Sequence, residues 1–578
     1  MKSEEKIQRL NGNDEYFLDS DTPEAPTHIG GLEIYDLPPG AGRDFLQKYY
    51  KQIKSAPVRA EPFNYVLSTL EPEQESKTDG PLGWMQPSAQ RKKKEKPVRV
   101  WKRLDKVNAD EHIYLHALPY PGSQRELGEL VARLHVNRLD RSRPLWEYHL
   151  IEGLEGGRYA VYVKLHHSQF DGKRGMSLAQ YTRSPKRSTR NMPPIWAVDL
   201  SKHYAAGAAA AKSAEPAEEP GALQKLTAFG KALSKMGEAR QNKPGEGVIG
   251  PYTAPPTILN GPLTPRRRLG TVSLPIPRIK ALGATVEGGA TVNEILLAVI
   301  GGALRRYLQD REALPKEPLI AACPVAVARK DGAAAGNAIA QILVSLGTQI
   351  ADPKKRLISV VESSRANKGL MKELDSAAYT SYVMLSMLPQ GLAAKTKYGH
   401  KVLNSNLIIS NVPGPRETQY VNGARMEAMY AAPLLLPGQA LNITASNFGD
   451  NLDIGIMACP DLCPSPQRIA IYMGEELATL ERAMGIKPAR PARKTGLAKR
   501  RKAVGAAASK QAAAKKATAK KEAAKKGAAP KATAKKATAK KVAAKKPAAK
   551  KATATKPAAK PRRRAPTRKA EAPAASAA

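Results

Sequence analysis

The stretch YAVYVKLHHSQFDGKRGM, residues 159–176, predicts a strand that ends on two adjacent histidines, His166 and His167. Because side chains alternate between the faces of a strand, we expect His167 to continue the apolar row that ends at Leu165, and His166 to point to the opposite side. Opposite orientations argue against one metal ion bound by both rings. Desolvation at the end of an apolar row lowers the pKa of an imidazole and favours the neutral form that a general base needs. The residues alone favour the simpler interpretation, in which the two histidines only stabilise the end of a strand.

Two further positions are candidate site residues. Asp171 and Gly172 fit a turn after the histidines, in which the aspartate bonds the local backbone or a nearby cation. Farther along, the helical stretch TVNEILLAVI predicts a capping box between Thr291 and Glu294, which gives the glutamate a structural role. Asn293 lies in the first turn, where free backbone N–H groups favour negative charge, so it is either a site residue or an ordinary exposed residue.

Length and composition indicate several domains with a separate basic tail. A chain of 578 residues is too long for one ordinary domain, and 42% apolar residues support globular cores. Of the net charge of +41, the segment from residue 487 to the C-terminus carries 31 Lys and Arg but only Glu522 and Glu571. The body is therefore only moderately basic.

The chain divides into four predicted segments. Residues 1–198 and 262–486 mix strand and helix patterns, such as the helix NEILLAVIGGALRRYL and the strand LNITASNF, and each is expected to form an α/β or α+β sandwich-like domain. Residues 199–261, rich in Ala, Pro, Glu and Gly, predict a long crossover with a weakly packed helix. Residues 487–578 predict a disordered Lys/Ala/Pro-rich tail.

Three cysteines in so long a chain, Cys323, Cys459 and Cys463, favour a reducing compartment and a structural role. The N-terminus has no apolar core typical of a signal peptide, and the longest apolar run falls short of the ~20 residues of a membrane span. We therefore expect a cytoplasmic protein that contacts membranes peripherally. No G-x-S-x-G, P-loop or G-x-G-x-x-G motif is present, so any catalysis would rest on the histidine pair.

The motif HHSQFDG, from His166 to Gly172, matches the HHxxxDG motif of the CoA-dependent acyltransferase superfamily, which includes peptide-synthetase condensation domains. The surrounding motifs occur in this order: FLDSDTPEAPTHIGGL, LDRSRPLWEYHLIEGLEGGRYAV, ATVNEILLAVIGGALRRYL, SNVPGP and GQALNIT. Together they closely resemble the bacterial wax ester synthase/diacylglycerol acyltransferase family over most of the chain up to about residue 484.

This resemblance implies two α/β domains with the motif in a tunnel at their interface. It implies that His167 is the general base and that Asp171 holds the loop whose tight turn Gly172 allows. It also implies that Pro144, Leu145 and Trp146, the family's PLW motif, shape the substrate channel. Ordinary packing at the start of a strand explains these three residues equally well.

The implied reaction moves a long-chain acyl group from acyl-CoA to diacylglycerol or a fatty alcohol, at a membrane or lipid-body surface, with no cofactor or metal. Candidate donors to the oxyanion are Asn293, Ser410 and Asn442. Two alternatives remain: a condensation-type enzyme with another acceptor, and a polyanion-binding protein with a degenerate acyltransferase body.

The chain departs from the family at two places. Ser168, Gln169 and Phe170 replace a small residue followed by aliphatic ones, which puts substrate preference in question. Glu294 stands where the family has aspartate, and a capping box explains why either acid serves there.

The tail resembles the C-terminal arms of linker histones. It has few arginines and no aromatic residue, so neither base stacking nor bidentate base reading is expected. Its repeated Lys-Lys units predict general binding to polyanions, such as DNA or an anionic leaflet, or else only a solubilising role.

We expect truncation after Pro488 to leave acyl transfer on detergent-dispersed substrate nearly unchanged and to weaken retention on duplex DNA sharply. Binding of the full chain should fall steeply with salt, by a slope of about −0.9 in log K against log[salt] for each neutralised phosphate, and should depend little on base sequence. Filter binding at several salt concentrations measures both effects. Retention that survives high salt would contradict this interpretation of the tail.

Overall fold

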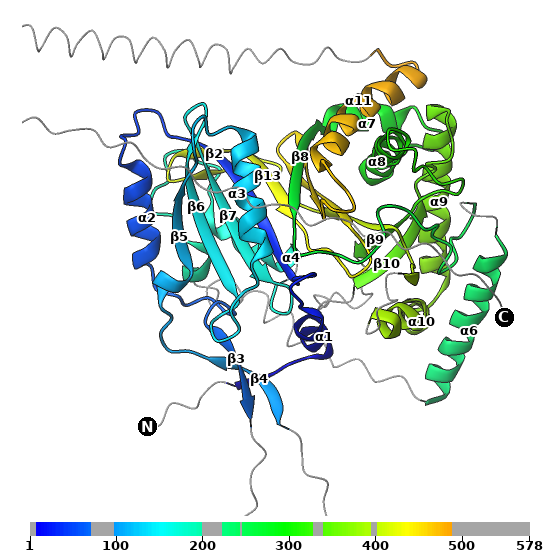
Figure 1. Cartoon of the computed structure of the whole chain (residues 1–578), viewed down its shortest axis with the longest axis horizontal. Coiled ribbons are helices and arrows are strands. Elements are labelled where there is room, and N and C mark those ends of the chain that lie inside the picture. Colours follow the sequence, from blue (N-terminus) through cyan, green and yellow to red (C-terminus); the bar gives the residue numbers. More distant parts are fainter. Residues whose placement is uncertain are drawn as a thin grey trace, which may run out of the picture. The chain divides into compact units, whose positions relative to one another are not determined.

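The computed structural model describes residues 7–70, 97–170, 172–198, 222–242, 246–326, 339–394 and 401–487. These residues belong to one compact unit, residues 1–501, and form two six-stranded sheets, a three-stranded sheet and the helices that cover them (Figure 1). The mixed α/β fold class is confirmed. The predicted tail beyond Lys487 and the candidate Asp171 lie outside the described residues.

The first sheet carries the histidine motif and has the strand order β12-β13-β2-β7-β6-β5. Strands β6 and β7 form the predicted hairpin around a glycine-containing turn, β2 pairs antiparallel with β7, and β5 runs parallel to β6. The strands are β12 (Tyr420–Val421), β13 (Ala424–Ala432), β2 (His28–Asp36), β7 (Arg158–His166), β6 (Trp146–Leu154) and β5 (Ile113–Ala117).

Helices cover both faces of this sheet. Helix α3 (Gln124–Val136) packs Leu127 and Val131 against one face, and α2 (Phe45–Ser55) packs Tyr49 and Ile53 against the other. Burial of these large apolar side chains stabilises the layers by roughly 1.5–3 kcal/mol each. Helix α4 (Gly172–Ala179) follows the motif, and its Leu178 joins the α2 side of the core.

The second sheet has the order β10-β9-β11-β14-β15-β8. Its main core packs the sheet against α8, whose residues from Ile295 to Leu304 are almost entirely buried. The strands are β10 (Ile339–Ser345), β9 (Ile320–Ala326), β11 (Leu407–Val412), β14 (Leu441–Phe448), β15 (Asn451–Ala458) and β8 (Arg268–Pro275). The helices are α7 (Ile276–Ala284), α8 (Val292–Gln309), α9 (Pro353–Glu373), α10 (Ser376–Ala394) and α11 (Pro466–Ala483).

Strand β13 joins the two halves of the fold. It pairs with β2 in the first sheet, although both β12 and β13 fall in the predicted second domain, residues 262–486. The first sheet therefore combines strands from both predicted domains. In the predicted crossover, residues 222–241 form helix α6 (Ala222–Gln241), which packs one face against α9 and α10.

Two contacts fix β13 to the second sheet. The backbone N–H of Met429 donates to the carboxylate of Asp453 on β15 at 2.8 Å. Gly455, also on β15, lies so close to β13 that a Cβ there would stand 1.7 Å from the carbonyl oxygen of Ala431. Only glycine allows this approach of two backbones.

A third, small sheet has the order β1-β4-β3, from strands β1 (Ile7–Arg9), β4 (Val98–Arg103) and β3 (Tyr65–Leu70). Helix α1 (Gly12–Ser20) follows β1 and begins at a capping box on Asn11. Short 3₁₀ turns lie at Ala109–Glu111, Gln180–Thr182 and Ile195–Ala197. Among the helices in the described ranges, none combines the length and apolarity that a membrane span needs.

The capping box predicted for α8 is confirmed. The backbone N–H of Thr291 donates to the Glu294 carboxylate at 2.8 Å, and the Glu294 N–H donates to the Thr291 hydroxyl at 3.3 Å. The other carboxylate oxygen of Glu294 accepts a hydrogen bond from Lys368 of α9 at 2.8 Å. Burial raises the pKa of Glu294, but the bonds from Lys368 and Thr291 outweigh it and hold the pKa below its usual value.

We expect Glu294→Gln to lower the free energy of unfolding by about 1 kcal/mol, because the cap survives and the ion pair is lost. Glu294→Ala should cost about 2–3 kcal/mol, since it also removes the cap. A depressed carboxyl pKa stabilises the fold above the unfolded pKa of about 4.3 and loses that effect as the pH falls through the folded value. The difference between wild type and Glu294→Gln should therefore shrink in acid when urea unfolding is followed by circular dichroism.

The matched control is Glu126→Gln in α3, where the Glu126 carboxylate accepts from the Ser123 N–H at 2.8 Å in another capping box. A Glu294→Gln protein as stable as wild type but inactive in acyl transfer would instead give the carboxylate a chemical role.

Candidate active site

The two motif histidines lie at the end of β7. His166 is the last residue of the strand, and His167 begins the turn that leads to α4 at Gly172. The backbone N–H of His167 donates to the carbonyl of Thr27 at 3.0 Å, and its ring stacks on Phe17 of α1 with ring centroids 4.2 Å apart. The strand ends one residue earlier than predicted, so the turn and this stacking position the His167 ring, rather than strand alternation.

His166 is buried in a hydrogen-bonded chain. The backbone N–H of Ser168 donates to His166 Nδ1 at 3.2 Å, so Nδ1 is an acceptor and the proton of a neutral ring lies on Nε2. Nε2 is 3.2 Å from the hydroxyl of Thr27, which in turn donates to the carbonyl of Phe17 at 2.8 Å. Burial lowers the pKa of His166, and nearby Asp21 opposes that shift. Both ring nitrogens therefore serve to hold the loop in place.

Asp21, just after α1, anchors this arrangement. Its carboxylate accepts from Arg138 Nε at 3.0 Å, from Arg141 at 3.2 Å and from the Thr27 N–H at 3.2 Å. One oxygen lies 3.9 Å from His166 Nε2. Burial raises the pKa of Asp21, yet the nearby His166 ring and the hydrogen bonds from Arg138 and the Thr27 N–H prevail and hold this pKa far below its usual range. A charged carboxylate thus lies directly behind the motif.

This network could not be predicted from the sequence. Asp21 and Thr27 fall in the first family motif. Arg141 lies at the start of the second motif and Arg138 immediately before it, more than 100 residues away. An isolated acid and two isolated arginines carry no periodic signal that would pair them. Only the ordered family motifs indicated that these stretches matter.

The PLW residues support the motif through packing. The carbonyl of Leu145 accepts from the His166 N–H at 3.1 Å. The Trp146 indole donates to the carbonyl of Phe63 at 2.8 Å, and Phe170 packs on the Phe63 ring with centroids 4.9 Å apart. The side chains of Leu145, Trp146 and Phe170 are buried in the core. The aromatic Phe170, which departs from the family pattern, thus fills space between the motif and the sheet.

The predicted oxyanion donors lie on the second sheet and on α8. Ser410 on β11 and Asn442 on β14 share one face of the second sheet, because Ser410 pairs with Thr444, two residues beyond Asn442. The Asn442 amide donates to the carbonyl of Leu434 at 2.8 Å. Asn293 occupies the first turn of α8, which Glu294 ties to α9. The structure thus brings the PLW residues to the histidines and Ser410 to Asn442.

In the described ranges no cluster of three or more His, Cys, Asp or Glu side chains is arranged to hold a metal ion. Cys323, Cys459 and Cys463 are all buried free thiols. Burial raises the pKa of Cys323 to about 12 and that of Cys463 to about 11, which keeps both thiols protonated and unreactive.

We expect Asp21→Asn to lower the free energy of unfolding by about 3 kcal/mol at pH 7, because Arg138 and Arg141 lose the carboxylate that they share. Since the folded pKa of Asp21 is depressed, its contribution is complete above the unfolded value of about 3.9 and is lost as the pH falls toward the folded value. The difference in free energy of unfolding between wild type and Asp21→Asn should therefore become smaller at low pH, as measured by urea unfolding.

Asp19→Asn is the matched control, since Asp19 is an exposed residue of α1 that pairs with Arg99 at 2.7 Å. Asp19→Asn should lower the free energy of unfolding by less than about 1 kcal/mol. Equal losses in the two variants would show that the Asp21 network does not hold the motif.

Comparisons with known proteins place these features in a family. Residues 10–296 match the wax ester synthase/diacylglycerol acyltransferase catalytic domain, and residues 335–481 match the WS/DGAT C-terminal domain. The O-acyltransferase WSD of Acinetobacter baylyi is 31% identical over 82% of this chain and 97% of its own. A Mycobacterium tuberculosis protein with the provisional name diacylglycerol O-acyltransferase is 35% identical over 83% of this chain and 98% of its own.

The fold of the chain also matches a solved structure of this family. The structure of the wax ester synthase/diacylglycerol acyltransferase from Marinobacter aquaeolei VT8 superimposes with a TM-score of 0.64, at 30% sequence identity, over 83% of this chain and all of the other. The chain matches both family domains in order and covers its relatives almost completely. It also carries the HHxxxDG motif at the end of β7. This chain belongs to the wax ester synthase/diacylglycerol acyltransferase family.

Proposed function

We propose that this enzyme transfers a long-chain acyl group from acyl-CoA to the hydroxyl of diacylglycerol or of a fatty alcohol, and so makes triacylglycerol or a wax ester. The observation that carries the proposal is the motif loop. One histidine is fully engaged in holding the loop, and the next is stacked on Phe17 where the loop turns away from the sheet. The relatives' names supply the two acceptor classes.

His167 acts as the general base in this mechanism. It removes the proton from the acceptor hydroxyl as that oxygen attacks the thioester carbonyl carbon. The tetrahedral intermediate then collapses, the carbon–sulfur bond breaks, and the protonated imidazole returns its proton to the CoA sulfur. A positioned base contributes typically about 10²–10⁴-fold in rate, and the thioester is already activated, so the reaction needs no covalent enzyme intermediate.

Two sets of residues complete the proposed site. Asp171 and Gly172 shape the loop, and Pro144, Leu145 and Trp146 support it from the sheet. Asn293, Ser410 and Asn442 remain candidates for donors to the oxyanion that develops on the thioester carbonyl. Ser410 and Asn442 are favoured over Asn293 by their common face, since donors from adjacent strands can converge on one atom.

We also propose that the enzyme works in the cytoplasm at the surface of a membrane or lipid body, where both lipid substrates reside. The basic tail is proposed to bind polyanions, DNA or an anionic leaflet, with no part in the chemistry.

We expect His167→Ala to lower kcat by about 10²–10⁴-fold in acyl transfer from palmitoyl-CoA to hexadecanol or dioleoylglycerol, with little change in stability. Release of the CoA thiol, followed with a thiol-reactive dye, measures the rate. His166→Ala should lose less activity but more stability, because it breaks the Thr27–Ser168 chain. Wild-type turnover by His167→Ala would exclude this mechanism, and comparison of the two acceptors identifies the preferred product.

A further inference from the structure

Phe17 is the side chain that packs on the proposed base. Its ring, only 8% exposed, stacks on His167 with the ring centroids 4.2 Å apart and the ring planes 20° from parallel. Thr27 joins the two residues, because its hydroxyl donates to the Phe17 carbonyl at 2.8 Å and its carbonyl accepts from the His167 N–H at 3.0 Å. His167 itself is only half-buried, so Phe17 covers one face of its ring while part of the side chain stays accessible.

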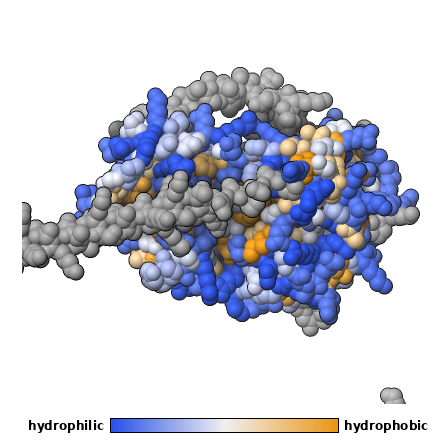
Figure 2. Space-filling model, turned by 90° about the horizontal axis from the view of Figure 1, so that it is seen from above, coloured by the Kyte–Doolittle hydropathy of each residue, from blue (hydrophilic) through white to orange (hydrophobic). Residues whose placement is uncertain are grey.

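The stack is largely shielded from water. Thr27, which contacts both residues, is buried, as are His166 and Ser168 on either side of His167 in the chain. By contrast, hydrophilic residues predominate on the face of the molecule seen from above (Figure 2). A cation within about 6 Å of the centroid of an aromatic ring is attracted by the negative face of that ring, and the attraction is stronger where water is excluded. At 4.2 Å the His167 ring lies well inside this range.

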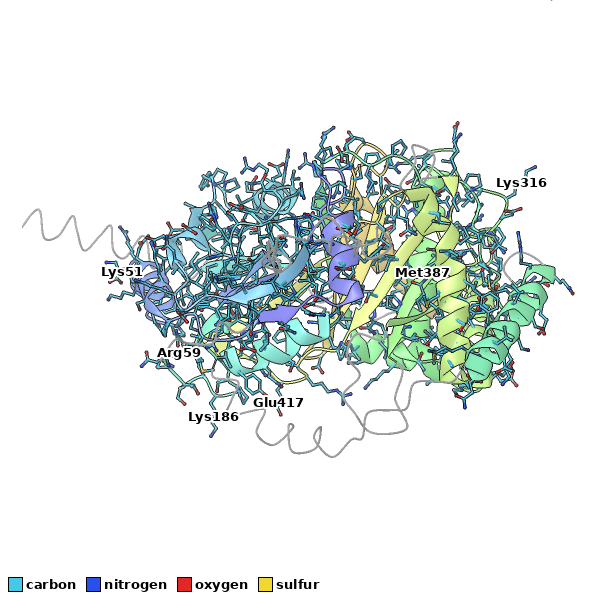
Figure 3. The ribbon with its side chains drawn as sticks, turned by 90° about the horizontal axis from the view of Figure 1, so that it is seen from below. Lys51, Arg59, Lys186, Lys316, Met387 and Glu417 are labelled. Carbon is cyan, nitrogen blue, oxygen red and sulfur yellow. The ribbon has the colours of Figure 1, made fainter. Side chains whose placement is uncertain are left out.

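Helix α1, which carries Phe17, is fixed at both ends. At its start, Asn11 and Asp14 form a capping box, and the Trp101 indole donates to the Asp14 carboxylate at 3.2 Å. Just beyond its end, Asp21 belongs to the buried network behind the motif. In the view from below, α1 lies between the strands of the first sheet and the helices of the second half of the fold (Figure 3). The stack is therefore preorganised, because the helix that presents Phe17 is held in place.

We propose that Phe17 is a positioning residue for the reaction, and that its ring face stabilises the positive charge that His167 acquires when it takes the proton of the acceptor hydroxyl. The inference rests on the proposed function, in which His167 is the base. In that step the hydroxyl proton moves to the imidazole while the oxygen bonds to the thioester carbon. The carbon–sulfur bond then breaks and the proton passes to the sulfur. Phe17 forms and breaks no bond.

The contribution of Phe17 depends on the charged form of the His167 ring. A general base is neutral before the proton moves, and the imidazolium is present only in the transition state and the tetrahedral intermediate. An interaction that is stronger in the transition state raises kcat and leaves KM nearly unchanged. Packing of Phe17 by shape alone would act equally on both forms of the ring. The two roles are separable, because fluorine atoms withdraw electron density from the face of a benzene ring and keep its shape and apolarity.

The test follows a single turnover of the full-length protein, in excess over palmitoyl-CoA, with the better of dioleoylglycerol and hexadecanol in detergent as the acceptor, so that product release does not mask the chemical step. Phe17 is replaced by mono-, di- and trifluorinated phenylalanine. We expect the rate of CoA thiol release to fall with each added fluorine atom, by about 3- to 30-fold in total, and Phe17→Leu to lose at least as much. The control places the same analogues at Phe45 of α2, whose ring centroid lies 6.3 Å from that of Tyr159, and should keep the wild-type rate.

Equal rates for wild type and the three fluorinated proteins would overturn the proposal, even with a slow Phe17→Leu, because the loss would then reflect shape alone. So would a graded loss of stability in urea unfolding that matches the loss of rate. His167→Ala is measured in parallel. An inactive His167→Ala with equal rates across the fluorinated series would refute only the role of Phe17, whereas wild-type turnover by His167→Ala would refute the base and the proposed mechanism with it.

Discussion

The motif depends on one buried carboxylate. Asp21 is almost inaccessible to water, and a charge in such a place is tolerated only if its hydrogen bonds are satisfied. Arg138, Arg141 and the Thr27 backbone satisfy them, which ties the end of α1, the segment after α3 and the residue before β2 to one point. Because Thr27 and Phe17 also contact the two histidines, the position of the proposed base follows from the requirement to neutralise one acid.

The two adjacent histidines make different contacts because their rings lie in different surroundings. On the side of β7 that faces α3, the fully buried Lys164 donates to Glu147 at 2.9 Å and to the Leu134 carbonyl at 3.1 Å. Burial lowers the pKa of Lys164, although Glu147 opposes the shift. His166 ends this polar row, with its ring in a network of fixed partners. His167 has left the strand and follows the geometry of a turn, where a ring can face a substrate without disturbing the sheet.

Local sequence patterns predicted individual helices and strands. Contacts between residues far apart in the sequence determined how these elements are arranged. Alternation and the glycine turn predicted the β6–β7 hairpin, and Thr291 with Glu294 predicted the start of α8, because both signals depend on neighbours within a few residues. The bridge that β13 makes between the two sheets could not be predicted, since its close approach to β15 depends on a glycine, Gly455, whose missing Cβ makes room for another strand. The Asp21 network could not be predicted from the sequence either. The motif indicated His167, but no periodic rule identifies which acid lies behind it.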